Sequence, residues 1–479
     1  MPASGMHRRV VAVDLDGTLI RTDLLAESIF LFVRKNPFAI LKIIFWLLKG
    51  KVILKQRLAD SVMPDFSTLP YDARVIAWVK EQKSHGAWVV LATASHQRIA
   101  VGVQQYLGIF SDVVGTTEKN LSSAGKRDEL VARYGQGGFE YLGNSVADLK
   151  VWDAASIAHV ANSPPALLRR VREISRIGHV FDGDGRYLTG LRRAVRLHQW
   201  AKNLLIFVPL LAAHRLFEWS LLWQAVLAFL CFGFCASSVY LLNDLLDLGD
   251  DRRQKTKKTR PLAAGTFPIL HAMIWMPVLL IAGGVVAAAF LPLKFLMVLL
   301  CYYGLTLLYS LWLKRIVMLD VVTLAMLYTL RVIAGAAAVS LSTTFWILAF
   351  CMFIFLSLAF VKRYTELYHT RSKSGSEKAH GRGYIGSDFE MLASLGAAAG
   401  YVSVLVLGLY INDVVAQSLY RSPQWMWAAC PLLLFWLSRV WLIAHRGEMQ
   451  DDPIVFAFRD RVSQCIGVLL AFAFLMAAL

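Results

Sequence analysis

The chain has 479 residues, 50 Lys and Arg against 33 Asp and Glu, a formal net charge of +17 and 57% hydrophobic residues. This composition excludes an intrinsically disordered chain, and six cysteines are too few for a secreted disulfide scaffold. The mean hydropathy of +0.52 is higher than soluble enzymes usually have, so much of the chain is expected to lie in a bilayer.

The first predicted element is a buried strand over residues 9–13, which ends in an acidic turn. Asp14 and Asp16 follow this strand in the run DLDGTL. Carboxylates two positions apart share one side of an extended chain, and the carboxyl end of a parallel strand faces the crevice where such sheets bind ligands. One carboxylate can then attack phosphorus while the other protonates the leaving oxygen, with a cation such as Mg²⁺ offsetting their repulsion. A surface turn that caps a helix is the alternative.

Residues 22–85 separate this turn from the next predicted strand as a long insertion. Within the insertion, residues 40–49 read ILKIIFWLLK, and Lys51 and Lys55 follow. An aliphatic and tryptophan-bearing surface edged by lysine suits contact with the inner leaflet of a membrane. A hydrophobic helix buried inside the insertion is the alternative, and the sequence does not choose between them.

Three later features extend the phosphate chemistry of the acidic turn. Thr93 ends the strand predicted over residues 88–92 and offers a hydroxyl to a phosphate oxygen. Lys126 precedes a helical segment and can balance phosphate charge. Asn144 and Asp148 follow a further strand over residues 139–142.

In this order the residues resemble the haloacid dehalogenase (HAD) phosphatase superfamily over about residues 8–180. The resemblance implies an α/β, Rossmann-like domain over residues 1–185, with a helical cap at about 22–85. It also implies that Asp14 is the nucleophile, Asp16 the general acid, Thr93 the phosphate hydroxyl and Lys126 the charge clamp. Mg²⁺ would be held by Asp14, Asp16, Asn144 and Asp148. The family usually has Asp where Asn144 stands, so one negative charge is missing.

From about residue 190 onward the chain is expected to be an all-α, polytopic membrane domain, residues 190–479. Apolar stretches long enough for about 20 residues per span recur there. About nine spans are expected: Asn203–Phe217, Ser220–Leu242, Phe267–Leu291, Leu293–Leu313, Leu319–Leu341, Thr344–Val361, Phe389–Asn412, Trp425–His445 and Arg461–Leu479. The first is short and carries Pro209, so a tilted or partly interfacial segment is the alternative there.

The positions of Lys and Arg predict the sidedness of this domain. They cluster before the first expected span, between the second and third, after the fourth and after the sixth. The positive-inside rule therefore places the amino-terminal domain and the basic loops in the cytoplasm and the carboxyl terminus on the opposite side. We expect a multi-pass protein of the cytoplasmic (inner) membrane, and the first residues do not resemble a cleavable signal peptide.

The second expected span ends in a cluster of acidic residues. Asp244, Asp247 and Asp251 are spaced i, i+3 and i+7, so a continued helix would put them on one face, and Asn243 adds an amide oxygen. A carboxylate at membrane depth costs about 2.5–3.5 kcal/mol, and three of them need a compensating cation. Mg²⁺ bound through substrate phosphates meets that need, whereas a solvated acidic loop is the alternative.

This cluster resembles the aspartate-rich motif of the UbiA superfamily of intramembrane prenyltransferases, and the resemblance covers about residues 190–479. Lys257 and Arg260 follow the motif as in that family, and Tyr309 and Lys314 resemble a further block of it. The resemblance implies Mg²⁺-dependent transfer in which Asn243, Asp244, Asp247 and Asp251 hold the metal.

The loop after the sixth expected span differs from that of prenyltransferases with aromatic acceptors, which carry a second aspartate-rich motif. Five residues of this region are candidates for substrate binding: Lys362, Arg363, Glu366, Arg382 and Tyr384. Such a basic set suits bare phosphate groups better than a second metal-bound diphosphate. Lys202 and Arg331 add positive charge at membrane depth. Because such charges are costly there, we expect both residues to have a function.

The run RLHQWAKN at residues 196–203, which includes Lys202 and Asn203, resembles the opening of the polyprenyl-phosphate phosphoribosyltransferase branch. That resemblance implies transfer of 5-phosphoribose from phosphoribosyl pyrophosphate to a polyprenyl phosphate in the membrane lipid. A HAD phosphatase on the same side could then remove the 5-phosphate of the product.

Two other classes of function stay open. One is an aromatic prenyltransferase with a regulatory or vestigial HAD domain, and the other is a transporter or lipid-binding scaffold. A nucleic-acid partner is not expected, because the basic residues lie in loops that flank the membrane and lack interleaved aromatic residues. The sequence leaves a homo-oligomer open.

Overall fold

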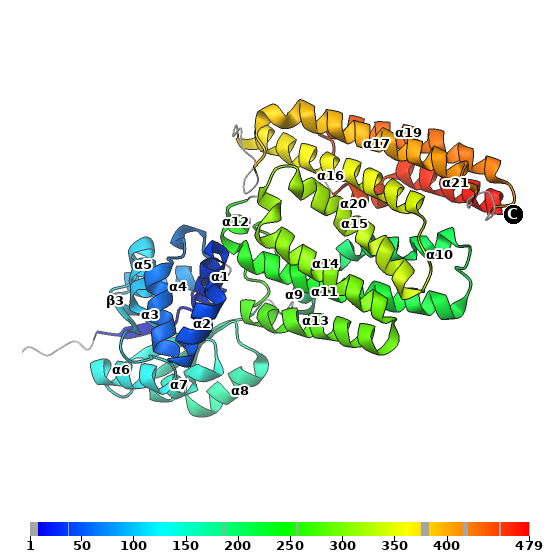
Figure 1. Ribbon diagram of the computed structural model, residues 1–479. Coiled ribbons are helices and arrows are strands. Elements are labelled where there is room, and N and C mark those ends of the chain that lie inside the picture. The colour runs from blue at the N-terminus through cyan, green and yellow to red at the C-terminus, as the bar shows by residue number, and fades with distance from the viewer. Residues whose placement is uncertain are drawn as a thin grey trace, which may run out of the picture. The chain divides into compact units, whose positions relative to one another are not determined.

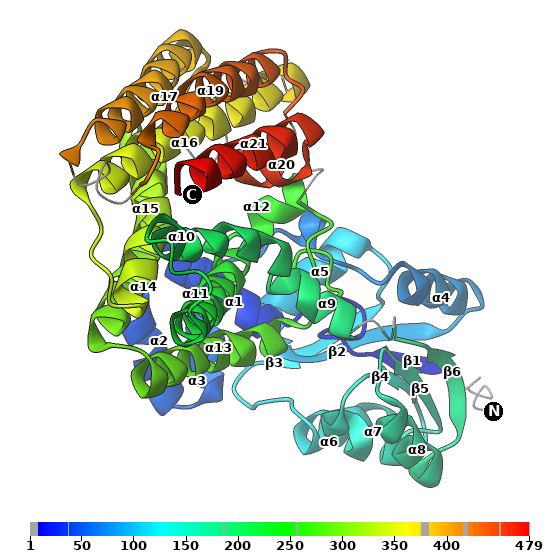
Figure 2. The ribbon, with the colours of Figure 1, turned by 90° about the vertical axis from the view of Figure 1, so that its right-hand side faces the viewer.

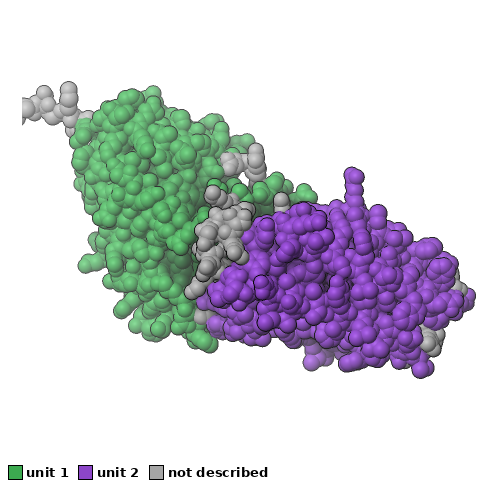
Figure 3. Space-filling view, turned by 90° about the horizontal axis from the view of Figure 1, so that it is seen from above, with its two compact units in different colours: residues 1–195, 240–276 green, residues 196–239, 277–479 purple. Residues whose placement is uncertain are grey.

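The computed structural model describes residues 8–36, 38–183, 185, 187–254, 257–374, 383–414, 420–449 and 452–478. The chain divides into two compact units (Figure 3). Unit 1 comprises Met1–Val195 and Tyr240–Met276, and unit 2 comprises Arg196–Val239 and Pro277–Leu479. The acidic cluster therefore belongs to the same unit as the amino-terminal domain. The domain limits 1–185 and 190–479 stay a prediction.

Unit 1 is built on a six-stranded sheet of order β3-β2-β1-β4-β5-β6 (Figure 2). Its strands are β1 (Val10–Val13), β2 (Trp88–His96), β3 (Asp112–Thr116), β4 (Glu140–Gly143), β5 (Ile157–Ala161) and β6 (Ile177–Phe181). All neighbouring strands are parallel. The chain adds β2 and β3 on one side of β1 and then β4 on its other side, so the strand order reverses between β1 and β4. Open parallel sheets bind ligands at such a reversal.

Helices cover both faces of this sheet, as the near-continuous apolar runs of its strands require (Figure 2). Val11 and Val13 of β1 pack with Val79 of α4 (Ala73–Ser84) and with α5 (Gln97–Leu107). Ala12, which points to the other face, packs with Trp152 of α7 (Leu149–Ala154) and with α6 (Ala124–Tyr134) and α8 (Pro165–Ile174). The predicted α/β class of the amino-terminal domain is confirmed.

The insertion is helical, and three of its helices share a small core of their own. They are α1 (Leu24–Lys35), α2 (Ala39–Leu48) and α3 (Lys51–Ser61), packed around Ile43, Leu54 and Leu58. The outer side of α2 is not covered, since Leu41 exposes 68% and Leu48 exposes 81% of its surface. The alternative of a helix buried inside the insertion is therefore wrong.

A buried ion pair joins α1 to α12 (Leu248–Arg253), the short helix that carries part of the acidic cluster. The Arg252 guanidinium donates to both carboxylate oxygens of Glu27, at 2.9 and 2.6 Å, and the two side chains expose only 6% and 4%. Two more exposed pairs lie beside it, Arg34 with Asp250 at 2.5 Å and Arg253 with Asp65 at 2.8 Å. The insertion thus holds α12 within unit 1.

Among the described residues, eight helices are long and apolar enough to cross a membrane (Figure 1). They are α11 (Trp219–Leu246), α13 (Ile269–Phe290), α14 (Leu293–Leu311), α15 (Leu319–Ala338), α16 (Phe345–Ser374), α17 (Phe389–Ile411), α19 (Ala429–His445) together with the 3₁₀ helix η6 before it (Pro423–Ala428), and α21 (Arg461–Ala478). Close packing in unit 2 uses small residues: a Cβ at Gly335 of α15 would lie 2.0 Å from the carbonyl oxygen of Ile206. The prediction of an all-α membrane domain is confirmed.

Eight of the about nine expected spans are helices of spanning length, and the exception among the described residues is the first, Asn203–Phe217. Residues Leu197–Phe207 form the 3₁₀ helix η3, and the α-helix that follows, α10 (Val208–Ala212), has only 5 residues. Pro209 stands in the first turn of α10, where a residue without an N–H is tolerated, so the α-helix begins there instead of continuing from η3. The segment is apolar enough for a span but too short as a helix.

The Glu27–Arg252 pair leads to a prediction about α12. Glu27→Gln leaves the buried guanidinium without a counter-charge, which costs about 3–5 kcal/mol. We expect amide hydrogen exchange in residues 248–254 of the full chain to become at least tenfold faster. The matched control is Glu129→Gln, which removes a surface partner of Arg133 in a pair that is 38–41% exposed and should change nothing. Unchanged exchange in the Glu27 variant would show that the pair does not hold α12.

Candidate functional site

An open cleft of about 910 Å³ lies in unit 1 and is lined by the side chains that follow the central strands. Its polar lining includes the carboxylates of Asp14, Asp16 and Asp148, the amide of Asn144 and the ammonium groups of Lys55 and Lys126. The same cleft is lined by residues 268–271, at the start of α13. The cleft therefore combines an acidic and basic centre with an apolar helix end.

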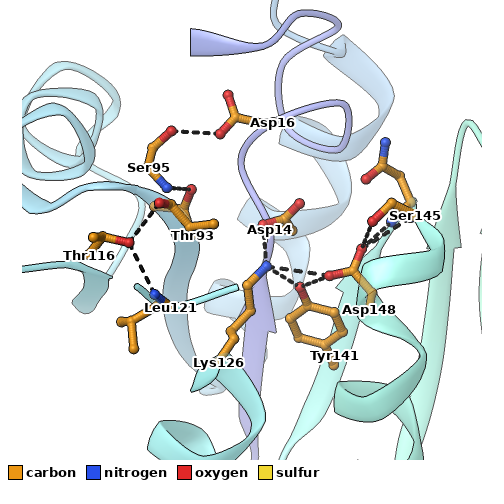
Figure 4. Close-up of polar contacts among 12 residues, drawn as sticks. Asp14, Asp16, Thr93, Ser95, Thr116, Leu121, Lys126, Tyr141, Ser145 and Asp148 are labelled. Carbon is orange, nitrogen blue, oxygen red and sulfur yellow. Dashed lines mark hydrogen bonds and ion pairs between the residues drawn. The ribbon is translucent and has the colours of Figure 1, made fainter. Parts of the chain in front are cut away.

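Lys126 joins two of the predicted acids (Figure 4). Its ammonium nitrogen lies 2.6 Å from Asp14 Oδ1, 3.4 Å from Asp148 Oδ1 and 2.7 Å from the Tyr141 hydroxyl. Burial raises the pKa of Asp14. Burial alone would lower the pKa of Lys126, but the charges of Asp14 and Asp148 raise it, so the lysine stays protonated between them.

Asp148 is held rigidly by donors on β4 and the turn after it. The Tyr141 hydroxyl donates to Asp148 Oδ1 at 2.7 Å. Asp148 Oδ2 accepts the backbone N–H groups of Asn144 and Ser145 at 3.2 and 3.1 Å. Although burial alone would raise the pKa of Asp148, Lys126 and these hydrogen bonds lower it. Asp148 is therefore an ionised acid with a fixed position.

Asp16 has the environment of a proton donor. Its carboxylate accepts the Ser95 hydroxyl at 2.7 Å (Figure 4). It also accepts the Leu24 N–H at 2.8 Å. Burial, with the negative charge of Asp23 beside it, raises the pKa of Asp16 to about 7. A carboxyl group with a pKa near the working pH is suited to general acid catalysis.

The structure brings together the predicted residues Asp14, Asp16, Lys126, Asn144 and Asp148, which all line the cleft. Thr93 lies behind the lining: it is fully buried, and its hydroxyl accepts the N–H of Ser95 at 3.0 Å.

Sequence reasoning missed Ser95, Tyr141 and Lys55. Ser95 could have been found, because it stands two positions after Thr93 in β2 and so points to the same side. Lys55 lies in the insertion, far from the motifs, and its ammonium group donates to the Ala94 carbonyl at 2.6 Å.

Gly17 is required beside Asn144. It has φ +76°, and a Cβ there would lie 2.1 Å from the Asn144 side-chain nitrogen. The glycine in the acidic turn thus makes room for the residue that departs from the HAD pattern.

The acidic cluster of unit 1 does not sit on one continuous helix. Helix α11 ends at Leu246 and α12 begins at Leu248, with Asp247 between them at φ −100° and ψ 11°. The expectation of an uninterrupted helix is therefore wrong. Asp244 and Asp251 still converge, because the Arg260 guanidinium donates to them at 3.2 and 2.7 Å.

This cluster has the donor set of a hard metal ion. Asp244 and Asp251 are each 2% exposed, and burial raises the pKa of Asp251 while Arg260 opposes it. Asn243 Oδ1 is buried and has no hydrogen-bond partner among the described residues. An orphaned buried acceptor beside carboxylates fits a cation bound through oxygen. Lys257 lies in the same loop, and its charge, like that of Arg260, opposes this rise in the pKa of Asp251.

Within the part of the chain that the structure describes, no three His, Cys, Asp or Glu side chains are already arranged as metal ligands. In both acidic groups a basic side chain of the protein lies between the carboxylates, Lys126 in one and Arg260 in the other. The carboxylate and amide oxygens of both groups are the ligand types that Mg²⁺ prefers. A bound Mg²⁺ would contact the same carboxylates that Lys126 and Arg260 now contact.

Two lysines of unit 2 share one carboxylate. Lys202 and Lys362 reach Asp452 Oδ2 at 2.8 and 2.9 Å. Burial alone would raise the pKa of Asp452, but the two lysines lower it well below its usual value. The Lys362 side chain is 28% exposed, against 8% for Lys202, so Lys362 is the more accessible cation of this group.

Arg363 and Arg331 are buried among protein acceptors. Arg363 is 2% exposed and bonds to Asp320, to Glu366 and, at 2.8 Å, to the Tyr309 hydroxyl. The Tyr384 hydroxyl also donates to Asp320, at 2.5 Å. The Arg363 charge is thus already neutralised by the protein.

The second arginine, Arg331, donates to Asn203 at 3.0 Å and to the Tyr302 hydroxyl at 2.9 Å. The Asn203 side-chain nitrogen is buried without a partner in the described chain. Lys314 is partly buried in the 3₁₀ helix η4 (Leu313–Arg315). The predicted Arg382 lies outside the described residues.

Sequence reasoning missed three partners in unit 2: Asp452, Asp320 and Tyr302. Asp320 had a signal, because a carboxylate inside an apolar span is expected to be paired. Asp452 stands directly before Pro453 and caps α20 (Pro453–Arg459), so in sequence it reads as an ordinary helix cap.

Two solved structures resemble parts of the chain. A UbiA homolog from Archaeoglobus fulgidus bound to DMAPP and Mg²⁺ is 16% identical, with a TM-score of 0.47, over 60% of this chain and 99% of that one. A phosphoserine phosphatase, solved as a phospho-aspartyl intermediate analogue, is 12% identical, with a TM-score of 0.26, over 36% of this chain and 93% of that one.

Three curated proteins resemble the chain more closely in sequence. The "Uncharacterized protein y4nM" of Sinorhizobium fredii is 34% identical over 97% of this chain and 90% of its own. The nodulation protein NoeC of Azorhizobium caulinodans is 37% identical over 59% of this chain and 92% of its own. A decaprenyl-phosphate phosphoribosyltransferase of Mycolicibacterium smegmatis is 29% identical over 58% of this chain and 89% of its own.

The family model "UbiA prenyltransferase family" matches residues 204–462, which include the acidic cluster and most of the predicted membrane domain. Because this match spans more than half of the 479 residues, the chain belongs to the UbiA prenyltransferase family.

Proposed function

We propose that the chain transfers 5-phosphoribose from phosphoribosyl pyrophosphate to a polyprenyl phosphate, and that its HAD-like domain then removes the 5-phosphate of the product. The observation that carries the transfer is the paired Asp244 and Asp251 with the orphaned oxygen of Asn243, which suits one metal-bound diphosphate. The similarity to a decaprenyl-phosphate phosphoribosyltransferase supports the choice of donor and acceptor.

In the transfer, a lipid phosphate oxygen forms a bond to the anomeric carbon of the ribose while the bond from that carbon to the diphosphate breaks. Asn243, Asp244, Asp247 and Asp251 would hold Mg²⁺, which when bound neutralises charge on the departing diphosphate. Arg260 and Lys257 would bind the same diphosphate. Lys202 and Lys362 would bind a phosphate group, which would replace Asp452 as the partner of the two lysines. No protein nucleophile is needed.

In the second reaction, Asp14 attacks phosphorus and Asp16 donates its proton to the leaving ribose hydroxyl, so that the phosphate is carried on Asp14 until water releases it. Lys126, protonated beside Asp14, offsets the negative charge of the phosphate. Asp14, Asp16, Asn144 and Asp148 would hold Mg²⁺, which when bound lowers the charge that the attacking carboxylate meets. Ser95, which lines the cleft, is placed to bind a phosphate oxygen.

The position of the protein is part of the proposal. The chain is an integral membrane protein by its family and its apolar helices. The distribution of Lys and Arg supports a location in the inner membrane, with the HAD-like domain and the basic loops in the cytoplasm and the carboxyl terminus on the opposite side. This sidedness gives the transfer reaction access to water-soluble phosphoribosyl pyrophosphate and puts the phosphatase on the same side of the membrane.

Asp251→Asn tests the transferase site. The change keeps the side-chain size but removes a charge from the proposed metal site, so we expect transfer of labelled phosphoribose to polyprenyl phosphate to fall at least 100-fold. Asp250→Asn is the matched control on the same helix, since its carboxylate pairs with Arg34 and should cost less than threefold. If the wild-type protein instead consumes a polyprenyl diphosphate with an aromatic acid, the proposed donor is wrong.

Asp14→Asn tests the phosphatase site. Loss of the nucleophile should reduce release of inorganic phosphate from the phosphoribosyl lipid about 10³-fold while phosphoribosyl transfer continues. Asp128→Asn is the matched control, because this aspartate is 63% exposed and pairs only at the surface with Arg127. Unchanged phosphate release in the Asp14 variant would refute a phosphatase role for the domain.

Asn144→Asp tests the departure from the HAD pattern. The added carboxylate restores one negative charge among the proposed Mg²⁺ ligands without changing the size of the side chain. We expect the Mg²⁺ concentration for half-maximal phosphate release to fall at least threefold. An unchanged Mg²⁺ requirement would place the metal away from Asn144. Gln136→Glu, which adds one negative charge at an exposed position of the same unit, is the control and should leave the Mg²⁺ requirement unchanged.

A further inference from the structure

Helix α2 carries an apolar surface that stays exposed among the described residues. Phe38, Leu41, Ile44, Phe45 and Leu48, which we call the α2 surface, expose 70%, 68%, 51%, 55% and 81%. Their spacing puts them along one side of the helix and its first flanking residue. A soluble surface seldom presents so many large apolar side chains together, so this side is expected to have a partner.

The opposite side of α2 is fixed to the insertion. Ala39 and Ile43 are 2% and 7% exposed, and Ile43 packs against Leu54 and Leu58 of α3. The ring of Trp46 lies 5.3 Å from that of Phe32 in α1. The helix is thus held with its outer side presented, and it cannot cover this side by rolling inward without exposing its own core.

The charged side chains around the α2 surface are all positive. Residues 28–59 contain seven Lys and Arg and no Asp or Glu. Lys35, Lys42, Lys49 and Lys51 are exposed at the ends and flanks of the helix. The Lys49 ammonium group lies 4.4 Å from the Phe45 ring centre, so its aliphatic stem runs along the apolar surface while its charge stays at the edge.

We propose that α2 lies in the headgroup layer of the bilayer that the chain spans, with the α2 surface toward the acyl chains and its lysines on anionic lipid phosphates. Ten residues make a helix about 15 Å long, half of the hydrocarbon thickness, so α2 lies along the surface and does not cross it. An apolar side rimmed by lysine fits an anionic membrane surface. A second copy fits less well, because it would bring the same positive charges together. This placement depends on neither proposed activity.

Photo-crosslinking in the full chain tests the proposal. The photoreactive amino acid p-benzoylphenylalanine is placed at Phe45 or, as the matched control, at Tyr106, which is aromatic and 51% exposed on α5 of the same unit. The protein is reconstituted in vesicles of phosphatidylcholine and phosphatidylglycerol and illuminated. We expect at least tenfold more phospholipid adduct at position 45 than at position 106. An adduct to a second copy or to another segment of the chain, or equal lipid adducts at both positions, would overturn the proposal.

The charge requirement is tested with the same probe at Phe45. Lys42→Glu with Lys49→Glu should reduce the lipid adduct at least threefold in vesicles that contain phosphatidylglycerol, and less in pure phosphatidylcholine. Lys80→Glu with Lys150→Glu reverses two exposed charges of the same unit away from α2 and should have no effect. Equal loss in both double variants would show that net charge, and not the lysines of α2, governs the contact.

Discussion

The Glu27–Arg252 ion pair is the contact on which the position of the acidic segment in unit 1 depends. Two charges that are 4% and 6% exposed stabilise each other only while both are present, since either one alone would be buried without compensation. The partners are 225 positions apart in the chain. Arg252 follows Asp251 directly, so the helix that carries this acid is fixed by the insertion of the amino-terminal domain. Tyr240–Met276 falls into the unit of the amino-terminal domain although it is continuous with two membrane helices, and contacts such as that of Tyr187 with Phe267 add to the ion pair.

The same rule of compensated charge organises unit 2. Arg363 is matched by Asp320 and Glu366, while Lys202 and Lys362 share Asp452. In a low-dielectric interior an unpaired cation of this kind would destabilise the protein, so it needs a counter-charge even without a ligand. A phosphate bound at Lys362, as proposed, would therefore replace Asp452 as the counter-charge of the two lysines. An uncharged ligand could not take over this role, so the exchange would select for a charged one.

The sequence predicted those features that follow from local pattern. A buried strand before Asp14 and Asp16 placed both acids at the carboxyl end of a central strand, and long apolar runs located eight of the membrane helices. Contacts between residues far apart in the sequence could not be predicted, such as the hydrogen bond from Lys55 to the Ala94 carbonyl. Hydropathy alone also failed where the backbone departs from a regular helix, at Pro209 and at Asp247. An apolar run such as that of α2 has no periodicity that distinguishes a buried side from an exposed one, so only the structure could choose.

In both acidic centres of unit 1, one basic side chain offsets the repulsion between two carboxylates. Carboxylates that must approach each other to bind a divalent cation repel when the cation is absent. Lys126 lies between Asp14 and Asp148, and Arg260 lies between Asp244 and Asp251, so a basic side chain of the protein keeps each pair close. A metal ion that takes over the carboxylates would free the lysine or arginine beside it. The freed cation would then stand next to the metal, where the phosphate oxygens of a substrate arrive. One basic residue would in this way hold the two carboxylates together without the cation and neutralise the phosphate of the substrate once the cation is bound.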